Sequence, residues 1–447
     1  MSEQLLSVGL DVGTTSTQLI LSRLTVENRA SAFAVPELEI ARREILYRSP
    51  VHFTPLLDES HVDGAALRTL VDREYQAAGI TRETVDTGAV IITGETSRKE
   101  NARAVLEALS DLAGDFVVAT AGPDLESVLA ARGAGAEEYS EKNGKTLLHM
   151  DIGGGTSNLA LIREGKITAT TCLNVGGRLI KYDNHSVITY ISPVLSGIVS
   201  SKVGDIVTKE LLQTVAGILV EALEMAAGRR PAGPLLQKLT TEEVTEDWAI
   251  PENAVISFSG GVADCIERDV PWQSFGDLGP VLGSAIRESA LCRGEYRLGR
   301  ETIRATVIGA GCHSVCLSGS TVFHRNISFP LKNLPVAAVS RWDRESVRRE
   351  LAKQDGPAIL ALPGVASPDY AQVAAMAEEL LAAGACYICL EQDMAKALGQ
   401  AMAVRTGGDV PILCLDRIRV GEGTYLDIGA PIGPAMPVVV KTLILGR

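Results

Sequence analysis

The sequence predicts an α/β protein built from two duplicated lobes and an additional C-terminal α/β domain. Two observations carry this prediction: a motif that recurs within the chain, and segments of strand and helix periodicity that alternate along its length. The 447 residues also exceed what one hydrophobic core usually holds, so several domains are expected. We place the two lobes at 1–147 and 148–295 and the C-terminal domain at 296–447.

The recurring motif comprises residues 8–21, VGLDVGTTSTQLIL, and residues 148–161, LHMDIGGGTSNLAL. The two segments align without a gap, which places Asp11 on Asp151 and Gly13 on Gly153. Each copy has an apolar strand, an aspartate, a turn of glycine and hydroxyl residues, and a second alternating strand. This pattern predicts a β-hairpin in each lobe. Two lobes that meet at such hairpins would form a cleft.

The other elements follow from periodicity. In the first lobe we expect strands within 31–48 and 51–57, a helix at 65–78, a buried strand at 85–97, and helices at 98–112 and 124–132 around a strand at 116–120. The second lobe continues with a helix at 205–228, a Pro/Gly-rich turn at 229–234, a strand at 254–267 and a helix at 276–292. The C-terminal domain begins with strand-like segments at 303–317 and 320–324. It continues with a strand at 358–364, a helix at 368–383, a strand at 385–391, a helix at 393–403 and two final strands.

The composition of both hairpin turns suits a nucleotide triphosphate. Glycines let backbone N–H groups approach phosphate oxygens, and Thr and Ser hydroxyls add further donors. A carboxylate at the end of the first strand can hold Mg²⁺, usually through water. The strand at 254–267 also contains a Ser-Gly-Gly-Val turn. The two hairpin turns therefore predict a site for a triphosphate and Mg²⁺, and the resemblance described next implies that the nucleotide is ATP or ADP.

These three motifs resemble the two phosphate motifs and the adenosine motif of the actin/Hsp70/hexokinase superfamily, whose ATPase lobes have a ribonuclease H-like fold. The resemblance implies that Asp11 and Asp151 are catalytic residues that hold the metal. It also implies a nucleotide-binding set of three loops: Gly13, Thr14 and Thr15; Gly153, Gly154, Gly155 and Thr156; and Ser259, Gly260, Gly261 and Val262.

Glu95 is a further candidate catalytic residue. Thr93-Gly94-Glu95 ends a buried strand where the superfamily's first connecting segment faces the cleft. From there a carboxylate could orient the water that attacks the nucleotide. The alternative is a solvated loop carboxylate or an ion-pair partner of Arg98 or Lys99.

Longer segments resemble the family of ethanolamine ammonia-lyase reactivating factors. They are LSVGLDVGTTSTQLILSRL, ITGETSRKENA, HMDIGGGTSNLA, VGGRLI, FSGGVADCI and TVIGAGCHSVCLSGST. The resemblance implies a chaperone with slow ATPase activity, which releases damaged cobalamin from inactivated ethanolamine ammonia-lyase so that adenosylcobalamin can rebind. The lyase would be its partner, and association with a bacterial microcompartment and formation of a homodimer are both open. The chain has no cobalamin motif of its own, because the segment at Asp183-Asn184-His185 has Ile188 where D-x-H-x-x-G requires glycine.

Two alternatives remain on the same fold: a small-molecule kinase and an actin-like filament or scaffold protein. An aromatic content of 4% argues against a sugar cleft, and hence against the kinase. The net charge of −13 disfavours a nucleic-acid partner, because such binding depends on neutralising phosphates. No apolar run approaches the ~20 residues of a membrane helix, and the chain start does not resemble a secretion signal. We therefore expect a cytoplasmic protein.

Overall fold

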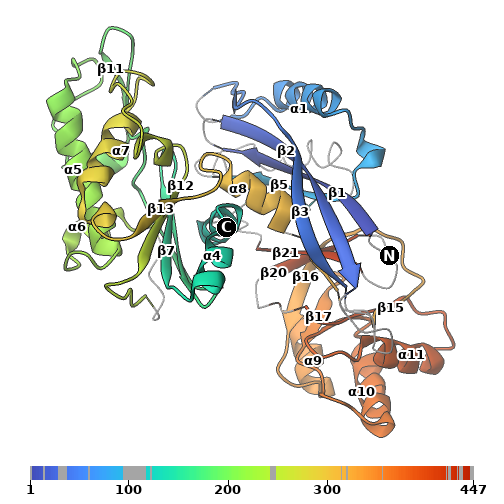
Figure 1. The fold of residues 1–447 in the computed structure, drawn as a ribbon. Coiled ribbons are helices and arrows are strands. Elements are labelled where there is room, and N and C mark those ends of the chain that lie inside the picture. The colour runs from blue at the N-terminus through green and yellow to red at the C-terminus, as the bar shows by residue number, and fades with distance from the viewer. Residues whose placement is uncertain are drawn as a thin grey trace.

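The computed structural model describes residues 3–13, 16–28, 38–58, 61–93, 117–120, 123–241, 248–313, 315–318, 321–354, 356–418, 420, 424–429, 431 and 436–442. Figure 1 shows two α/β lobes side by side and the C-terminal domain below the first of them. The predicted helix at 98–112 and the candidate residues Thr14, Thr15 and Glu95 lie outside the described residues.

The first lobe is built on one mixed sheet. Its described strands have the order β3-β2-β1-β5-β6, and β4 pairs with β2. The bounds are β1 (Glu3–Val12), β2 (Ser16–Asn28), β3 (Leu38–Arg48), β4 (His52–Phe53), β5 (Thr87–Ile92) and β6 (Val117–Thr120). Strands β1, β2 and β3 are antiparallel, whereas β5 and β6 continue parallel to β1. The helix α1 (Gly64–Ala78) covers one face, and it begins at the side-chain cap of Asp63 and ends at the left-handed Gly79.

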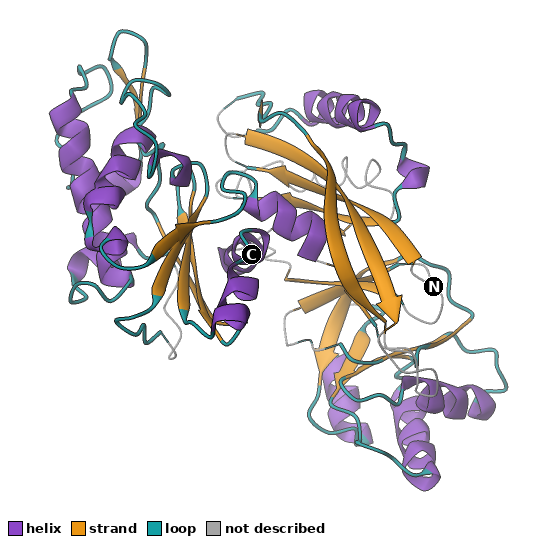
Figure 2. Ribbon diagram, in the orientation of Figure 1, coloured by secondary structure: helices purple, strands orange, loops and turns teal. Residues whose placement is uncertain are grey.

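The second lobe repeats this topology. The order β9-β8-β7-β12-β13 again places the first strand between an antiparallel pair and a parallel pair. The bounds are β7 (Leu147–Ile152), β8 (Ser157–Arg163), β9 (Lys166–Leu173), β12 (Val255–Ser259) and β13 (Tyr296–Leu298). Its outer face is covered by α5 (Lys209–Ala226), α6 (Pro234–Leu239) and α7 (Gly279–Glu288), as Figure 2 shows, and a small hairpin, β10 (Ile180–Tyr182) with β11 (Ile188–Ile191), stands apart. The duplication predicted from the repeated motif is confirmed.

Each lobe contributes a helix to the other lobe. The helix α3 (Pro123–Gly133) follows the first sheet but packs on β7, β8 and β9 of the second, ahead of α4 (Ala136–Asn143). The helix α8 (Ala305–Ile308) follows the second sheet, continues as a π-helix over Gly309–His313, and packs on β1 and β5. The two helices cross at glycines: a Cβ on Gly133 would come within 1.8 Å of the carbonyl oxygen of Ala305. This exchange joins the lobes directly behind the two hairpins.

The strand predicted over 303–317 is wrong for most of its length, since residues 305–313 are helical and only β14 (Val315–Leu317) is extended. Ala305, Thr306, Val307 and Ile308 are all buried, because the helix lies between α3 and the first sheet. A helix that is enclosed on all sides carries no polar face, so its sequence reads as a continuous apolar run that periodicity cannot distinguish from a strand.

The C-terminal domain is an additional α/β domain, as predicted. Its sheet has the order β14-β21-β20-β16-β17-β18-β19-β15 among the described strands, with β16 to β19 parallel. The helices α9 (Arg344–Leu351), α10 (Tyr370–Ala383) and α11 (Ala395–Arg405) cover one face. The strand bounds are β15 (Phe323–Arg325), β16 (Leu331–Ala338), β17 (Ile359–Leu362), β18 (Tyr387–Leu390), β19 (Ile412–Leu415), β20 (Thr424–Ile428) and β21 (Pro437–Thr442). The domain boundaries at 147/148 and 295/296 stay predictions.

Within the described part of the chain, none of the helices combines the length and the apolar character needed to cross a membrane.

Candidate nucleotide site

Both predicted hairpins are present and close in the same way. In the first, the backbone N–H of Gly13 donates to the carbonyl oxygen of Ser16 at 2.9 Å. In the second, the N–H of Gly153 donates to the carbonyl oxygen of Thr156, also at 2.9 Å. The two turns therefore match residue by residue, and each places its aspartate near the carboxyl end of the hairpin's first strand.

Asp11 lies beside β5, the parallel neighbour of β1. Thr93, which directly follows β5, donates its hydroxyl to Asp11 Oδ1 at 2.8 Å, and its backbone N–H donates to Val12. Burial raises the pKa of Asp11 to about 7; the Thr93 hydrogen bond opposes this shift, and the nearby charge of Asp151 adds to it. The carboxylate of Asp151 is therefore near enough to affect the titration of Asp11, although the two aspartates are far apart in the chain.

Asp151 is 6% exposed and is held from two elements. The Ser259 hydroxyl donates to its Oδ1, and the Thr306 hydroxyl lies 3.5 Å from its Oδ2. Burial raises the pKa of Asp151 to about 6 despite these hydrogen bonds. Neither the buried Asp151 nor the half-buried Asp11 forms an ion pair with any described residue.

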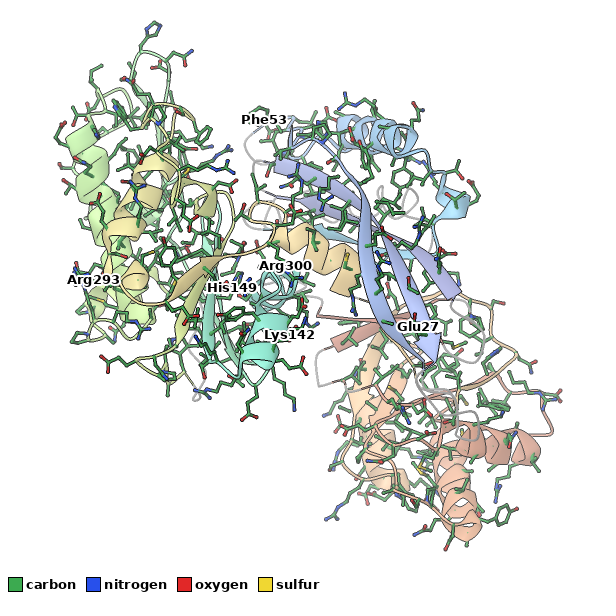
Figure 3. All side chains as sticks on the ribbon, viewed as in Figure 1. Glu27, Phe53, Lys142, His149, Arg293 and Arg300 are labelled. Atoms are coloured by element: carbon green, nitrogen blue, oxygen red, sulfur yellow. The ribbon has the colours of Figure 1, made fainter. Side chains whose placement is uncertain are left out.

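His149 supports Asp151 from within the second sheet, where Figure 3 labels it. The ring is fully buried, with Nδ1 3.1 Å from the Ser257 hydroxyl and Nε2 2.9 Å from the Ser259 hydroxyl. Burial lowers the pKa of His149 to about 3, so the ring is neutral. Since Ser259 gives its only proton to Asp151, Nε2 must carry the ring proton and donate to Ser259, while Nδ1 accepts from Ser257. This chain of hydrogen bonds fixes the orientation of the carboxylate.

The predicted adenosine turn packs on the end of β7. Gly260 has a φ of +86°, and a Cβ there would come within 2.3 Å of the Ile152 carbonyl oxygen, so only glycine fits. Around Gly261, in contrast, a Cβ would meet no atom within 4 Å, which leaves its surroundings open to a ligand. The side chain of Val262 is buried in the outer core of the second lobe, so only its backbone could contact a nucleotide.

Arg178 is a further candidate site residue, which motif reasoning missed. Its backbone N–H donates to the carbonyl oxygen of Gly154 at 2.7 Å, and its Cδ lies 3.4 Å from the position of a Cβ on that glycine. Asp277 binds Arg178 Nε at 3.3 Å and also accepts from the N–H of Gly279 at the start of α7. Among the described residues, the terminal guanidinium nitrogens have no partner. The only sequence signal was the G-G-R of residues 176–178, because the contact depends on a loop from another part of the lobe.

One cavity lies elsewhere, in the second lobe. It has a volume of about 780 Å³, runs between α5 and α7, and is lined by residues that include Lys209, Arg268, Trp272 and Arg287. None of the predicted site residues lines it. The described residues also contain no cluster of three or more His, Cys, Asp or Glu side chains placed to hold a metal.

The chain matches the family model described as "Ethanolamine utilisation protein EutA" over residues 3–446. It is 40% identical to a protein of Salmonella typhimurium, "Ethanolamine ammonia-lyase reactivase EutA", and 39% identical to the protein of that name in Escherichia coli, each over 99% of both chains. Among solved structures, EutJ from Carboxydothermus hydrogenoformans covers 68% of this chain and 89% of its own, with 19% identity and a TM-score of 0.35. An Aquifex aeolicus PPX-GPPA enzyme covers 69% and 99%, with 12% identity and a TM-score of 0.42. The sequence similarity to the two reactivases extends over the whole chain and is not confined to the nucleotide motifs.

Proposed function

Since this chain belongs to the family of the ethanolamine utilisation protein EutA, we propose that it is a reactivating factor for ethanolamine ammonia-lyase. It would use ATP to release damaged cobalamin from the inactivated lyase, so that adenosylcobalamin can rebind. The observation that carries this function is the 40% identity to a named reactivase over the full length of both chains. A kinase or a filament protein of the same fold would share the hairpins but would have no reason to resemble reactivases in the C-terminal domain.

The hairpins would hold the phosphates of ATP or ADP. Backbone N–H groups of the glycine turns donate to phosphate oxygens, and the Thr14, Thr15 and Thr156 hydroxyls add donors. Arg178, anchored by Asp277, would bring a guanidinium to the same phosphates, which it can bind with two parallel hydrogen bonds. Gly260 and Gly261 would lie under the adenosine. Glu95 would orient the attacking water, which makes this protein a slow ATPase.

The residues present fit Mg²⁺. The buried Asp151 and the half-buried Asp11 have raised pKa values and no cationic partner among the described residues. Such carboxylates are poorly stabilised alone, and a divalent cation would compensate both. Oxygen ligands of this kind are those that Mg²⁺ prefers, and it keeps several of its waters. When bound, Mg²⁺ would neutralise charge on the phosphates. Asp11 and Asp151 would hold it, with Thr93 and Ser259 fixing their orientation.

Motion of the lobes would transmit the nucleotide state. The helices α3 and α8 cross between the lobes at glycines without side chains, so a change at the hairpins acts directly on this crossing. The chain continues from α8 into β14 of the C-terminal domain. We propose that this domain engages the lyase, that the protein acts in the cytoplasm in association with a microcompartment, and that it works as a homodimer without nucleic acid or membrane partners.

The test is recovery of ethanolamine ammonia-lyase activity after inactivation with cyanocobalamin. The assay contains this protein, MgATP and free adenosylcobalamin, with a control that omits ATP. We expect recovery that requires ATP, and its loss in Asp11→Ala and Asp151→Ala. Absence of recovery in the presence of confirmed ATP binding would refute the function.

Glu95→Gln separates catalysis from binding. The substitution removes a charge but keeps the size of the side chain, so ATP hydrolysis should fall while ATP affinity stays close to that of the wild type. Equal losses of both would show that Glu95 binds nucleotide and does not orient water.

A further inference from the structure

Two buried amide oxygens stand at equivalent positions of the repeated hairpins. Gln18 and Asn158 occupy the same place in the gap-free alignment, seven residues after Asp11 and Asp151. Gln18 is 4% exposed and Asn158 is 2% exposed, and neither Gln18 Oε1 nor Asn158 Oδ1 has a hydrogen-bond partner among the described residues. A buried acceptor without a donor costs about 1–3 kcal/mol. Both duplicated positions therefore carry a buried acceptor that no described residue satisfies.

The strand register places each amide beside a carboxylate. Gln18 is the direct cross-strand partner of Asp11, and Asn158 is that of Asp151. Directly opposed residues of an antiparallel pair point to the same face, with Cβ atoms about 4.5–5.5 Å apart. In each lobe the amide therefore lies on the same face of the sheet as the carboxylate of its hairpin.

Two hydroxyl groups near the carboxylates already donate hydrogen bonds to them. The Thr93 hydroxyl donates to Asp11, and the Ser259 hydroxyl donates to Asp151. Gln18 Nε2 donates to the carbonyl oxygen of Ile303 at 3.1 Å, which fixes the amide and leaves Oε1 as its free acceptor. The amide group cannot be rotated by 180°, because Oε1 would then face the carbonyl oxygen of Ile303. Among the described residues, hydroxyl groups donate to both carboxylates, whereas neither amide oxygen has a donor, so acceptors outnumber donors in this group.

Building on the proposed nucleotide function, we propose that Gln18 and Asn158 accept hydrogen bonds from the water shell of the divalent cation that accompanies the nucleotide. A hydrated cation presents only donors to its surroundings, which is the complement of this acceptor group. The phosphates themselves are acceptors and cannot satisfy the two oxygens. The amides thus contact the waters bound to the metal and not the metal itself, and they align the hydrated metal between the two hairpins.

Four variants test this assignment. Gln18→Leu and Asn158→Leu remove the acceptor at similar volume, whereas Gln18→Glu and Asn158→Asp keep an acceptor oxygen. Mn²⁺ binding is followed by electron paramagnetic resonance with saturating ADP, and ADP affinity is measured separately in EDTA. We expect about fivefold weaker Mn²⁺ binding in each leucine variant, from the loss of one hydrogen bond, with metal-free ADP affinity unchanged. The acidic variants should bind Mn²⁺ at least as tightly as the wild type.

Unchanged Mn²⁺ affinity in both leucine variants would overturn the proposal. So would an equal loss of ADP affinity in EDTA, since the amides would then contact the nucleotide itself. Thermal unfolding of metal-free Asn158→Leu is the folding control: removal of an unpartnered acceptor should leave its melting temperature unchanged or higher. None of these measurements involves the lyase. If the Mn²⁺ affinities change as expected but the lyase is not reactivated, the proposed function is refuted and the role of the two amides is not.

Discussion

Cation binding at the paired carboxylates should release protons in a narrow pH range. A metal binds the ionised forms, but burial, together with the nearby charge of Asp151, raises the pKa of Asp11 to about 7, and burial raises that of Asp151 to about 6. At pH 6.5 the metal-free pair therefore carries about one proton in total, and at pH 8 about a tenth of one. If the two groups titrate independently, their deprotonation should increase the affinity for the cation about twentyfold between pH 6 and pH 8.

The proton count is measurable by isothermal titration calorimetry in two buffers of different ionisation enthalpy. Mg²⁺ is titrated into the protein with saturating nucleotide at pH 6.5 and at pH 8. Nucleotide phosphates also release protons in this range, since their second pKa is about 6. Asp11→Asn is therefore the matched control. This variant keeps the nucleotide contribution and should lose about three quarters of the protein's proton release at pH 6.5.

Infrared spectra of the metal-free protein give an independent readout, because a protonated carboxyl has its own C=O band. That band should lose intensity between pH 6 and pH 8 in the wild type and not in a variant that lacks both carboxyls. If the wild type and Asp11→Asn release the same number of protons at pH 6.5, and the band does not change, then Asp11 is ionised throughout and the reasoning from burial is refuted.

Three further substitutions and one control, Gly217→Ala, test the packing and the electrostatics of the protein by thermal and urea unfolding. Gly133→Ala places a methyl group against the Ala305 carbonyl and should destabilise the protein by about 1–3 kcal/mol. The control Gly217→Ala lies in a helix, where the new methyl group would meet no atom within 4 Å, and should stabilise the protein by up to about 1 kcal/mol. Equal stabilities of the two variants would contradict the close helix crossing. His149→Leu leaves two buried serine hydroxyls without their ring partner and should cost about 1–3 kcal/mol, and wild-type stability would argue against the buried chain of hydrogen bonds. Asp151→Asn should stabilise the metal-free protein by about 1–3 kcal/mol at pH 8, because a folded pKa above the unfolded value means that stability is lost as pH rises through about 6. At pH 4 this gain should be absent, and a gain independent of pH would contradict the assigned pKa.

The sequence by itself determined the duplicated plan and the position of both aspartates. The hairpins are encoded locally, by alternating apolar residues that end in a glycine turn, and the turn bonds at Gly13 and Gly153 are the same in both lobes. The alternation of strands and helices also sufficed to predict an additional C-terminal α/β domain, whose sheet the structure contains.

Only the tertiary structure decided how the site is assembled. Thr93 reaches Asp11 because β5 lies parallel beside β1, and Ser259 reaches Asp151 because β12 lies beside β7; neither pairing is written in local periodicity. The anchoring of Arg178 and the unpartnered oxygen of Gln18 likewise depend on segments about 100 and 285 residues away. The helix at 305–313 was missed for the same reason. It is enclosed by elements from both lobes, so its burial depends on an exchange of helices that a single segment of sequence cannot express.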